Sequence, residues 1–330
     1  MRRTDGEDDR LWAITSYYNP VGYRMRRENY RRFRDSLGVP LVAVELAYRD
    51  DFELEDGDAD ILIRLRGRDV MWQKERLLNI ALKAVPAGCR KVAWVDADVL
   101  FARDDWAAAA SDLLDRWPMV QLFEHVHYMP CGLSPERFAP DRAELNRQSV
   151  TSAAVGTADP GATLYAASPF FVGAYATGMA WAARRDLLDV HGFYDRCIVG
   201  SGDRAMVAAA WGAFDHVLTR FAMGEAYARH FLIWAKRFRD DVGGRIAPLD
   251  GDVFHLWHGA LGKRANSARH RELSSFGYDP FSDLALTPEG PWQWNSDKPA
   301  MHAYLRSYFA SRQEDGAPAS APRSADGAAA

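Results

Sequence analysis

The sequence predicts an α/β protein whose mainly parallel central sheet is flanked by helices, and two observations lead to this prediction. Apolar runs of strand length alternate with amphipathic runs of helix length through the first part of the chain. This alternation is typical of parallel sheets, because a helix carries the chain back before the next strand begins. In addition, 48% of the 330 residues are hydrophobic, which is enough to bury a full core.

Each expected element of the first half has its own signal. The run LWAITSYY predicts a strand that Asn19 and Pro20 end. The following segment places Tyr23, Tyr30 and Phe33 near a 3.6-residue period, which predicts a helix. In order, we expect a strand over 11–18, a helix over 21–38, strands over 40–46 and 59–65, a helix over 72–85 and a strand over 91–101.

The second half of the chain is less regular. We expect a strand over 119–126, a loop and helix excursion over 131–152, and a strand followed by a helix over 178–192. Residues 160–183 carry no charge and are long enough to span a bilayer, but Pro169 and several glycines dilute their hydropathy. We therefore expect buried strand and loop there, and no transmembrane segment.

The two ends of the chain differ in composition from the rest. Residues 313–330 are mainly Ala, Pro, Ser and Gly with almost nothing to bury, which predicts a disordered tail. Residues 1–9 lack the apolar core of a signal peptide and are expected to be a flexible N-terminus. We therefore place one folded domain over 10–312 and expect a cytoplasmic protein. Three scattered cysteines without a CxxC pair also fit a reducing compartment.

The charge of the chain limits its partners. A formal net charge of -4 predicts no broad nucleic-acid surface, although local basic patches can still form. One such patch is the arginine-rich segment RMRRENYRRFR, which either contacts anionic lipid at a membrane surface or forms a solvated helix face. We therefore expect no nucleic-acid partner and leave peripheral membrane contact open.

Two aspartates interrupt the apolar run KVAWVDADVLF. On an extended segment Asp96 and Asp98 would point to the same side, where their charges repel each other. A divalent cation is the usual way to keep both ionised, and without the cation the loss of one charge would stabilise the protein. A turn or a helix cap is the alternative, although Asp104 and Asp105 already offer a cap for the next helix.

Polar residues also follow two earlier strands. Asn19 and Glu45 lie at the ends of the first two expected strands, as Asp96 and Asp98 lie at the end of a later one. In mainly parallel sheets, ligands gather beyond the carboxyl ends of the strands. These four residues are therefore expected at one edge of the sheet.

Three further clusters carry polar groups that suit a ligand site. Lys74 and Asn79 belong to the early turns of a helix, which either attract a phosphate or face solvent. Asp203 follows two glycines, and either faces a ligand or caps a helix. His255 and His258 flank a tryptophan in FHLWHG, and either bind a metal or are buried structural side chains.

The order of these clusters resembles nucleotide-sugar-dependent glycosyltransferases of the A fold, in particular the galactosyltransferase and N-acetylgalactosaminyltransferase type. The likeness runs from Leu11 to His258 and rests on WQKERLLNIAL, KVAWVDADVLF, GMAWAARRDLLDVHGFYDRCIVGSGDRAM and FHLWHG. In that family a D-x-D motif at a strand end holds Mn²⁺ and the donor diphosphate. A later Gly-rich acidic motif faces the acceptor, and a late histidine completes the metal shell. The resemblance implies a glycosyltransferase A-fold catalytic domain over 10–312.

Carried onto this sequence, the resemblance implies a metal site made by Asp96, Asp98 and one of the two late histidines. We expect His255 in preference to His258, because residues three apart can hardly enter one shell together. The residues implied at the nucleotide sugar are Asn19, Glu45, Lys74, Asn79 and Asp96. The acidic motif departs from the family pattern of Glu-Asp or Glu-Asn after the glycines. This chain has Asp203 there, to which we assign the activation or orientation of the acceptor hydroxyl.

The implied function is a metal-dependent glycosyltransferase that moves a sugar from a nucleoside-diphosphate sugar, in particular a UDP-sugar, to a hydroxyl of a glycan or another acceptor. Glycan or cell-surface polysaccharide synthesis is the expected setting. Negative charge builds on the leaving diphosphate, and Mn²⁺ or Mg²⁺ would stabilise that charge. A histidine ligand favours Mn²⁺ over Mg²⁺.

Two alternatives remain open at this point. A nucleotidyltransferase would use the same diphosphate chemistry, but it normally needs a Gly-rich basic loop after the first strand, and SYYNPVGYRMRR is a poor version of one. A catalytically silent carbohydrate-binding protein would keep the fold and leave the donor intact. Metal-stimulated turnover of a nucleotide sugar separates both from the main interpretation.

Overall fold

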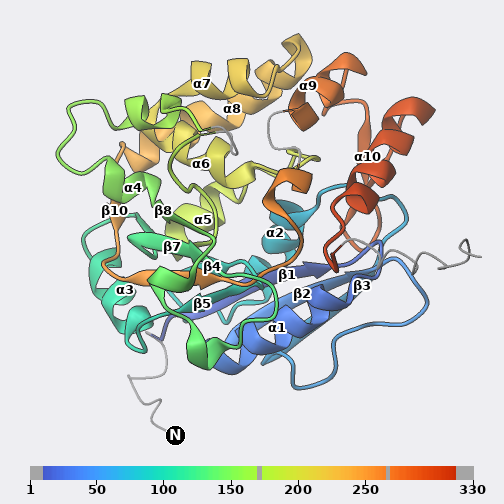
Figure 1. Cartoon of the computed structure of the whole chain (residues 1–330). Helices are drawn as coiled ribbons and strands as arrows, with labels where there is room; N and C mark the ends of the chain where they lie inside the picture. Colours follow the sequence, from blue (N-terminus) through green and yellow to red (C-terminus); the bar gives the residue numbers. More distant parts are fainter. Residues whose placement is uncertain (1–9, 169–172, 265–267, 317–330) are drawn as a thin grey trace, which may run out of the picture.

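A seven-stranded sheet forms the centre of the protein in the computed structural model, which describes residues 10–168, 173–264 and 268–316 (Figure 1). The strand order is β10-β6-β9-β4-β1-β2-β3. All neighbouring pairs are parallel except the two made by β9, which is antiparallel to β4 and β6. The strands are β1 Trp12–Tyr18, β2 Leu41–Ala47, β3 Ile61–Arg66, β4 Lys91–Val95, β6 Met119–Gln121, β9 Ala180–Arg184 and β10 Ile246–Pro248. The predicted fold class is confirmed.

Helices cover both faces of this sheet, because alternate side chains of its strands are buried on opposite sides. Val42 of β2 packs in the same cluster as the apolar residues of α2 (Lys74–Ala84), whereas its neighbour Ala43 packs with those of α1 (Arg24–Ser36). Every residue of β2 is buried, as its continuous apolar run predicts. The predicted helices and strands from β1 to α2 are confirmed, with bounds that differ by at most three residues.

Two runs that were predicted as single strands are each divided between two sheets. After β4 the chain turns at Asp96–Asp98 and enters β5 (Val99–Phe101), which belongs to a four-stranded sheet of order β5-β11-β7-β8. The predicted strand over 119–126 likewise divides into β6 and β7 (His125–Tyr128). Asp96 and Asp98 therefore lie in a turn and not on an extended segment. The other strands of the second sheet are β8 Leu145–Gln148 and β11 Asp252–His255.

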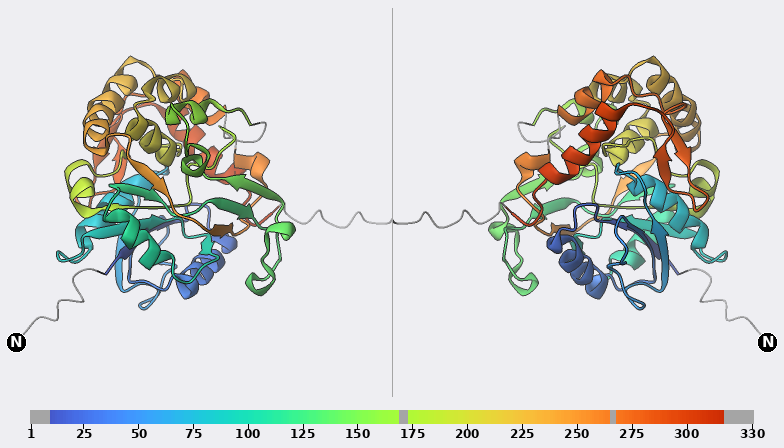
Figure 2. Two further views of the ribbon diagram at one scale, coloured as in Figure 1. Left: turned by 90° about the vertical axis from the view of Figure 1, so that its left-hand side faces the viewer. Right: turned by 90° about the vertical axis from the view of Figure 1, so that its right-hand side faces the viewer.

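The second half of the chain supplies most of the remaining helices, and Figures 1 and 2 show α6 to α10 on the same side of the central sheet as α2. The predicted strand and helix over 178–192 are confirmed as β9 and α5. The predicted excursion over 131–152 contains two short 3₁₀ turns, β8 and α4. The helices are α3 Trp106–Leu114, α4 Val150–Ala153, α5 Arg185–His191, α6 Gly202–Trp211, α7 Phe214–Arg220, α8 Glu225–Val242, α9 Ala268–Ser275 and α10 Pro299–Ser311; a hairpin of β12 Leu284–Leu286 and β13 Trp292–Trp294 precedes α10.

Within the residues that the structure describes, no helix has both the length and the apolar character needed to cross a membrane. The uncharged run 160–183 contributes a 3₁₀ helix over Pro160–Tyr165 and then β9, while residues 169–172 lie outside the described part. The prediction of strand and loop agrees with what is described of this run.

The predicted cap of α3 is wrong. Asp105 occupies the position before the helix, but its side chain makes no capping hydrogen bond. Its two carboxylate oxygens instead accept hydrogen bonds from Arg103, at 2.6 and 2.8 Å. A charged partner two residues away competes successfully with the backbone amides of the helix.

The end of the described chain is packed more closely than its composition predicts. Residues 313–316 follow α10 and lie against the start of α1, and Glu314 is completely buried. The predicted tail therefore does not begin at Gln313, and the packed region reaches at least Gly316. The predictions for residues 1–9 and 317–330 lie outside the described residues.

Candidate active site

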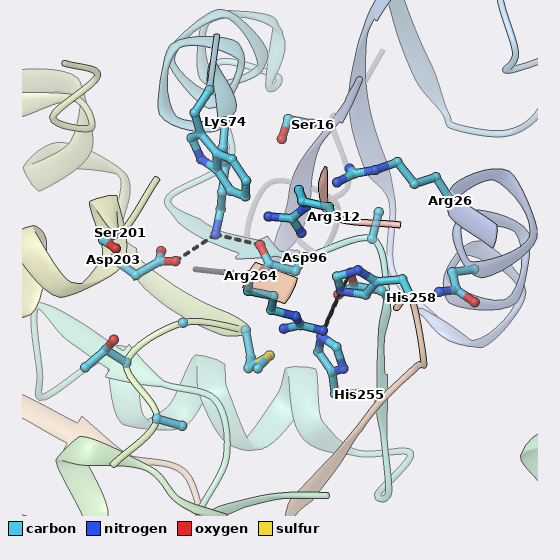
Figure 3. Close-up of a pocket in the computed structure, with 18 of the residues that line it drawn as sticks. Ser16, Arg26, Lys74, Asp96, Ser201, Asp203, His255, His258, Arg264 and Arg312 are labelled. Carbon is cyan, nitrogen blue, oxygen red and sulfur yellow. Dashed lines mark hydrogen bonds and ion pairs between the residues drawn. The ribbon is translucent and has the colours of Figure 1, made fainter. Parts of the chain in front are cut away.

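A pocket with a volume of about 230 Å³ opens at the carboxyl ends of β1 and β4, the edge of the sheet where the polar strand ends were expected (Figure 3). Parallel pairing of β1 with β4 brings these two ends together. The first turns of α2 and α6, the end of β11 and Arg312 after α10 also contribute to the lining. Residues far apart in sequence therefore meet at the position that the α/β topology favours for a ligand.

Asp98, His255 and His258 form one cluster in this pocket. Their ligand atoms all lie within 4.8 Å of one another. Asp98 is held in the turn before β5, where its backbone oxygen accepts a hydrogen bond from Leu256 at 2.8 Å. Antiparallel pairing of β5 with β11 sets His255 opposite Val99, directly beside this turn. The strand register therefore places the carboxylate next to both imidazoles.

Both histidines reach the site, although only one of them was predicted to bind the metal. The chain bends after β11, so that the Nε2 atoms of His255 and His258 lie 3.3 Å apart. The His258 Nε2 is 3.1 Å from Asp98 Oδ2, and the His255 Nε2 is 3.8 Å from Asp98 Oδ1. On a continuous strand, side chains three residues apart would point to opposite faces. The bend after β11 removes this constraint, so both imidazoles point into the pocket.

These three groups fit a transition-metal ion. Neighbouring ligands at about 2.1 Å from an octahedral ion are separated by about 3.0 Å, close to the spacings within this cluster. A carboxylate with two imidazoles is also a donor set that such ions prefer. Asp98 Oδ1 is buried and has no hydrogen-bond partner among the described residues. A buried carboxylate oxygen without a partner is costly, and a cation would supply one.

The protonation states of the cluster suit a metal site as well. Burial acts to raise the pKa of Asp98, but His255, His258 and Arg264 outweigh it, so that the pKa lies below its ordinary value. Burial lowers the pKa of His255 far below its ordinary value, and Asp98 only partly offsets this. Near neutral pH the carboxylate is therefore ionised and the His255 imidazole is neutral, as metal ligands must be.

Asp96, the other predicted metal ligand, is not part of this cluster. Its Oδ1 lies 2.5 Å from Lys74 Nζ, and the same ammonium group lies 2.8 Å from Asp203 Oδ2. Figure 3 shows Lys74 between the two carboxylates. Burial lowers the pKa of Lys74, but Asp203, Asp96 and Glu75 raise it well above its ordinary value, so that the ammonium stays charged. The two aspartates of the D-x-D motif thus face different partners.

Glu75 makes the stability of the protein depend on pH. Burial raises the pKa of its carboxyl from 4.5 to about 8, although Lys74 opposes this effect. Between these two values the folded protein holds a proton on Glu75 that the unfolded chain has lost. Stability therefore falls as pH rises through this window, by up to about 1.4 kcal/mol per pH unit for one proton.

We expect Glu75→Gln to be more stable than the wild type at pH 9 and equally stable at pH 4.5, because glutamine resembles only the neutral carboxyl. Urea unfolding of both proteins at pH 4.5, 7 and 9 measures the difference. Glu289→Gln, at an exposed position, is the control and should give the same difference at each pH. A Glu75→Gln effect that does not change with pH would contradict the expectation.

Three residues predicted at the nucleotide sugar lie outside the pocket lining and bond the protein's own backbone. Asn19 closes the turn after β1, because its Oδ1 accepts hydrogen bonds from the amides of residues 22–23. Glu45 accepts hydrogen bonds from the amides of residues 53–54, and Asn79 exchanges hydrogen bonds with the backbone after α5. Lys74 and Asp203 do line the pocket.

Arginines from distant parts of the chain line the pocket and were not predicted as site residues. Arg26 comes from α1, Arg264 from the 3₁₀ turn Leu261–Arg264, Arg269 from α9, and Arg312 follows α10. A terminal nitrogen of Arg264 lies 3.0 Å from His258 Nε2, which places a positive charge beside the three-residue cluster. The only sequence signal for any of them was the arginine-rich segment that contains Arg26.

Several other arginines of that segment pair with acidic side chains of the same protein. The ion pairs are Arg24 with Glu28 at 2.6 Å, Arg27 with Glu55 at 2.8 Å and Arg34 with Asp60 at 3.1 Å. Exposed pairs of this kind contribute little to stability, but they offset the positive charge of the helix. Membrane contact through this helix stays a prediction.

Comparisons with known proteins add solved structures of related architecture. No protein-family model matches the sequence, and no curated protein matches it. TarS of S. aureus in complex with UDP-GlcNAc is 15% identical at a TM-score of 0.39, over 76% of this chain and 59% of that chain. The Drosophila β1,4-galactosyltransferase 7 mutant in complex with manganese, UDP-Gal and xylobiose is 11% identical at a TM-score of 0.36, over 88% and 97%. A mycobacterial protein is 14% identical at a TM-score of 0.42, over 87% and 83%.

This chain therefore spans less than two thirds of the TarS structure that it matches. All three TM-scores lie below 0.5.

Proposed function

We propose that this protein is a metal-dependent glycosyltransferase that uses a nucleoside-diphosphate sugar, in particular a UDP-sugar, as donor. One observation supports this most: a cluster of side chains suited to bind a metal ion lies in the same pocket as an excess of positively charged side chains. Asp98, His255 and His258 would hold Mn²⁺, while the neighbouring arginines would bind the diphosphate oxygens. The D-x-D motif at the end of a central strand, on which the family resemblance rests, lies in the same pocket.

The balance of charges in the pocket favours an anionic ligand. Its lining contains four carboxyl groups, which are Asp96, Asp98, Asp203 and the protonated Glu75, and seven cationic side chains, which are Arg26, Lys74, Arg147, Arg204, Arg264, Arg269 and Arg312. One more carboxylate, Glu314, lies behind Arg26 and Arg312, so positive charge still exceeds negative charge. A bound divalent ion adds two further charges. A diphosphate would offset part of this excess, whereas a neutral glycan alone would not.

Different residues of the pocket would have different roles in sugar transfer. When bound, the metal ion stabilises the negative charge that builds on the leaving diphosphate. Arg264 and Arg312 add hydrogen-bond donors of fixed geometry for the same oxygens. Trp72 and Tyr18 offer aromatic surface in the lining, with ring centroids 5.8 Å apart, against which a base or sugar ring would pack. Asp203 would accept the proton of the acceptor hydroxyl or orient it.

One observation disfavours a nucleotidyltransferase. Such an enzyme would need backbone amides after β1 for the phosphates of its nucleotide. Here the amides of Gly22 and Tyr23 are already bonded to the side chain of Asn19, at 3.1 and 2.8 Å. The connection after β1 is a closed turn and not a phosphate-binding loop.

Thermal unfolding with UDP and a panel of nucleotide sugars tests the proposal. We expect UDP together with Mn²⁺ to raise Tm, and each alone to raise it less. Ligand at 100 times its Kd adds about 2.7 kcal/mol of stability. Release of nucleoside diphosphate from one sugar donor of the panel then identifies the substrate. A protein that binds UDP equally well with EDTA, and releases nothing, would contradict metal-dependent transfer.

A further inference from the structure

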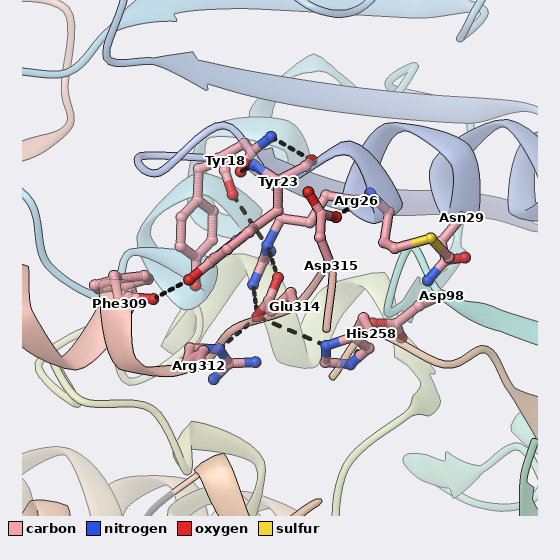
Figure 4. A network of polar contacts seen from close by, with 12 residues as sticks. Tyr18, Tyr23, Arg26, Asn29, Asp98, His258, Phe309, Arg312, Glu314 and Asp315 are labelled. Carbon is pink, nitrogen blue, oxygen red and sulfur yellow. Dashed lines mark hydrogen bonds and ion pairs between the residues drawn. The ribbon is translucent and has the colours of Figure 1, made fainter. Parts of the chain in front are cut away.

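The C-terminal strap, which we define as residues 312–316, joins the end of α10 to the start of α1 and to the pocket (Figure 4). Asp315 accepts hydrogen bonds from the amides of Arg24 and Met25, at 3.0 and 2.8 Å, and so satisfies the exposed start of α1. The backbone N–H of Gln313 donates a hydrogen bond of 3.1 Å to the hydroxyl oxygen of Tyr23. The strap is therefore fixed at several points although its sequence is poor in apolar residues.

Glu314 points inward from this strap into a ring of basic side chains (Figure 4). It accepts hydrogen bonds from Arg26 Nε and Arg312 Nε, each at 2.5 Å, and from the Arg26 terminal nitrogen at 2.8 Å. Its Oε1 lies 3.6 Å from Nδ1 of His258. Burial acts to raise the pKa of Glu314, but the two arginines lower it well below its ordinary value, so that the carboxylate is ionised.

The strap and the turn that carries His258 are in direct contact. Gly259 has φ +89°, and a Cβ there would lie 2.9 Å from the backbone oxygens of Arg312 and Gln313. Only glycine allows both this conformation and this approach. His258 Nδ1 is buried and finds no hydrogen-bond partner of normal length among the described residues, so the Glu314 carboxylate is the group that faces it.

We infer that Glu314 is a positioning residue for His258, and this inference rests on the proposed metal-dependent function. A carboxylate beside Nδ1 keeps the imidazole proton on that nitrogen, so that Nε2 presents its lone pair toward Asp98 and His255. Arg26 and Arg312 fix the carboxylate in turn. The last part of the described chain thereby completes the metal site, which lies between strands far from it in sequence.

Binding of Mn²⁺ alone, measured by titration calorimetry on the full chain without nucleotide, tests this role. We expect Glu314→Gln to weaken Mn²⁺ binding by about ten- to a hundredfold, the usual effect of losing a partner that orients a ligand. Asp315→Asn is the control on the same strap, because the Asp315 side chain bonds the start of α1 and does not face His258, and asparagine keeps one of its two acceptor oxygens. It should leave Mn²⁺ affinity unchanged.

Two further measurements separate positioning from a general loss of structure. UDP affinity in EDTA should be retained in Glu314→Gln, because Arg26 and Arg312 keep their charge, whereas a damaged pocket would lose affinity for both ligands. If Glu314→Gln does not fold, the double variant Arg26→Gln/Glu314→Gln removes a cation together with the carboxylate, and Mn²⁺ binding is measured in that variant.

The results for His258→Ala separate the two levels of the proposal. If the Glu314 variants keep their Mn²⁺ affinity while His258→Ala loses affinity, the positioning role of Glu314 is overturned but the metal site is not. Unchanged affinity in His258→Ala would overturn the metal site and the proposed function with it.

Discussion

Asp98→Asn is expected to abolish the Mn²⁺-dependent binding of UDP and to leave the protein folded. Asp98 is the only carboxylate in the three-residue cluster, and an amide oxygen carries no charge with which to hold a cation. Titration calorimetry with Mn²⁺, and Tm with UDP in Mn²⁺ and in EDTA, measure the effect. We expect the extra Tm rise that Mn²⁺ gives to UDP in the wild type to vanish in the variant.

The same change should lower the stability of the metal-free protein, and this reverses the expectation from sequence that removing a repelling carboxylate stabilises it. The pKa of Asp98 lies below its ordinary value of 3.8, because the histidines and Arg264 outweigh the effect of burial. The carboxylate therefore stabilises the fold above pH 4, and this contribution is lost as pH falls further. Asparagine should cost about 1–3 kcal/mol at pH 7, measured by urea unfolding.

Asp96→Asn is the matched control for metal binding, because it lies in the same turn but is bonded to Lys74 and lies outside the cluster. It should keep most of the Mn²⁺ affinity. An equal loss in both variants would instead mean that Asp96 also binds the metal, as the D-x-D pattern predicted. Unchanged UDP binding in Mn²⁺ for Asp98→Asn would end the metal proposal.

The sequence was informative where structure is decided locally. β1, β2, α1 and α2 follow from apolar periodicity and from the residues that end each run, and neither signal depends on distant parts of the chain. The run KVAWVDADVLF was misread for the opposite reason. Its apolar residues on both sides of the two aspartates favour a strand, but a second sheet recruits β5 through pairing with β11, which begins at Asp252. A break caused by such pairing leaves no local pattern.

Only some of the site residues could be predicted from the sequence, for similar reasons. Asp98, Lys74, Asp203 and the two histidines lie in motifs, whereas the pocket arginines are single residues whose meeting depends on the fold. Glu314 shows a second limit, because composition measures apolar burial and this residue is buried by ion pairs. Asn19 and Glu45 were expected at a ligand because polar residues at strand ends often face one. In this protein both are used to close loops.

Asp203→Asn is expected to lower the rate of sugar transfer by about a hundredfold or more, with donor binding retained. The residue lies at the second position of α6, and its carboxylate enters the pocket beside Lys74. The alternative role as a helix cap finds no support, since the hydrogen bond described for its side chain comes from Lys74 and not from an amide of α6. Gly178 allows close approach to this carboxylate, because a Cβ there would lie 3.2 Å from Asp203 Oδ2.

The size of the effect follows from the role. If the carboxylate accepts the proton of the attacking hydroxyl, asparagine cannot replace it, and general-base catalysis contributes about a hundredfold or more. If it only orients the acceptor, asparagine keeps a hydrogen-bond acceptor and the loss should be smaller. Transfer rates at saturating donor, together with the Tm shift given by UDP and Mn²⁺, separate an effect on catalysis from one on binding.

Asp195→Asn is the control for the loss of an ion pair in itself. Asp195 pairs with Arg196 at 2.6 Å and with Arg76 at 3.3 Å, is about as buried as Asp203, and does not line the pocket. We expect Asp195→Asn to lower Tm and to keep the transfer rate of the protein that remains folded, because its charge never meets the acceptor. A near wild-type rate of transfer in Asp203→Asn would reject the assignment of Asp203 as the general base. The role of its carboxylate would then be the ion pair with Lys74.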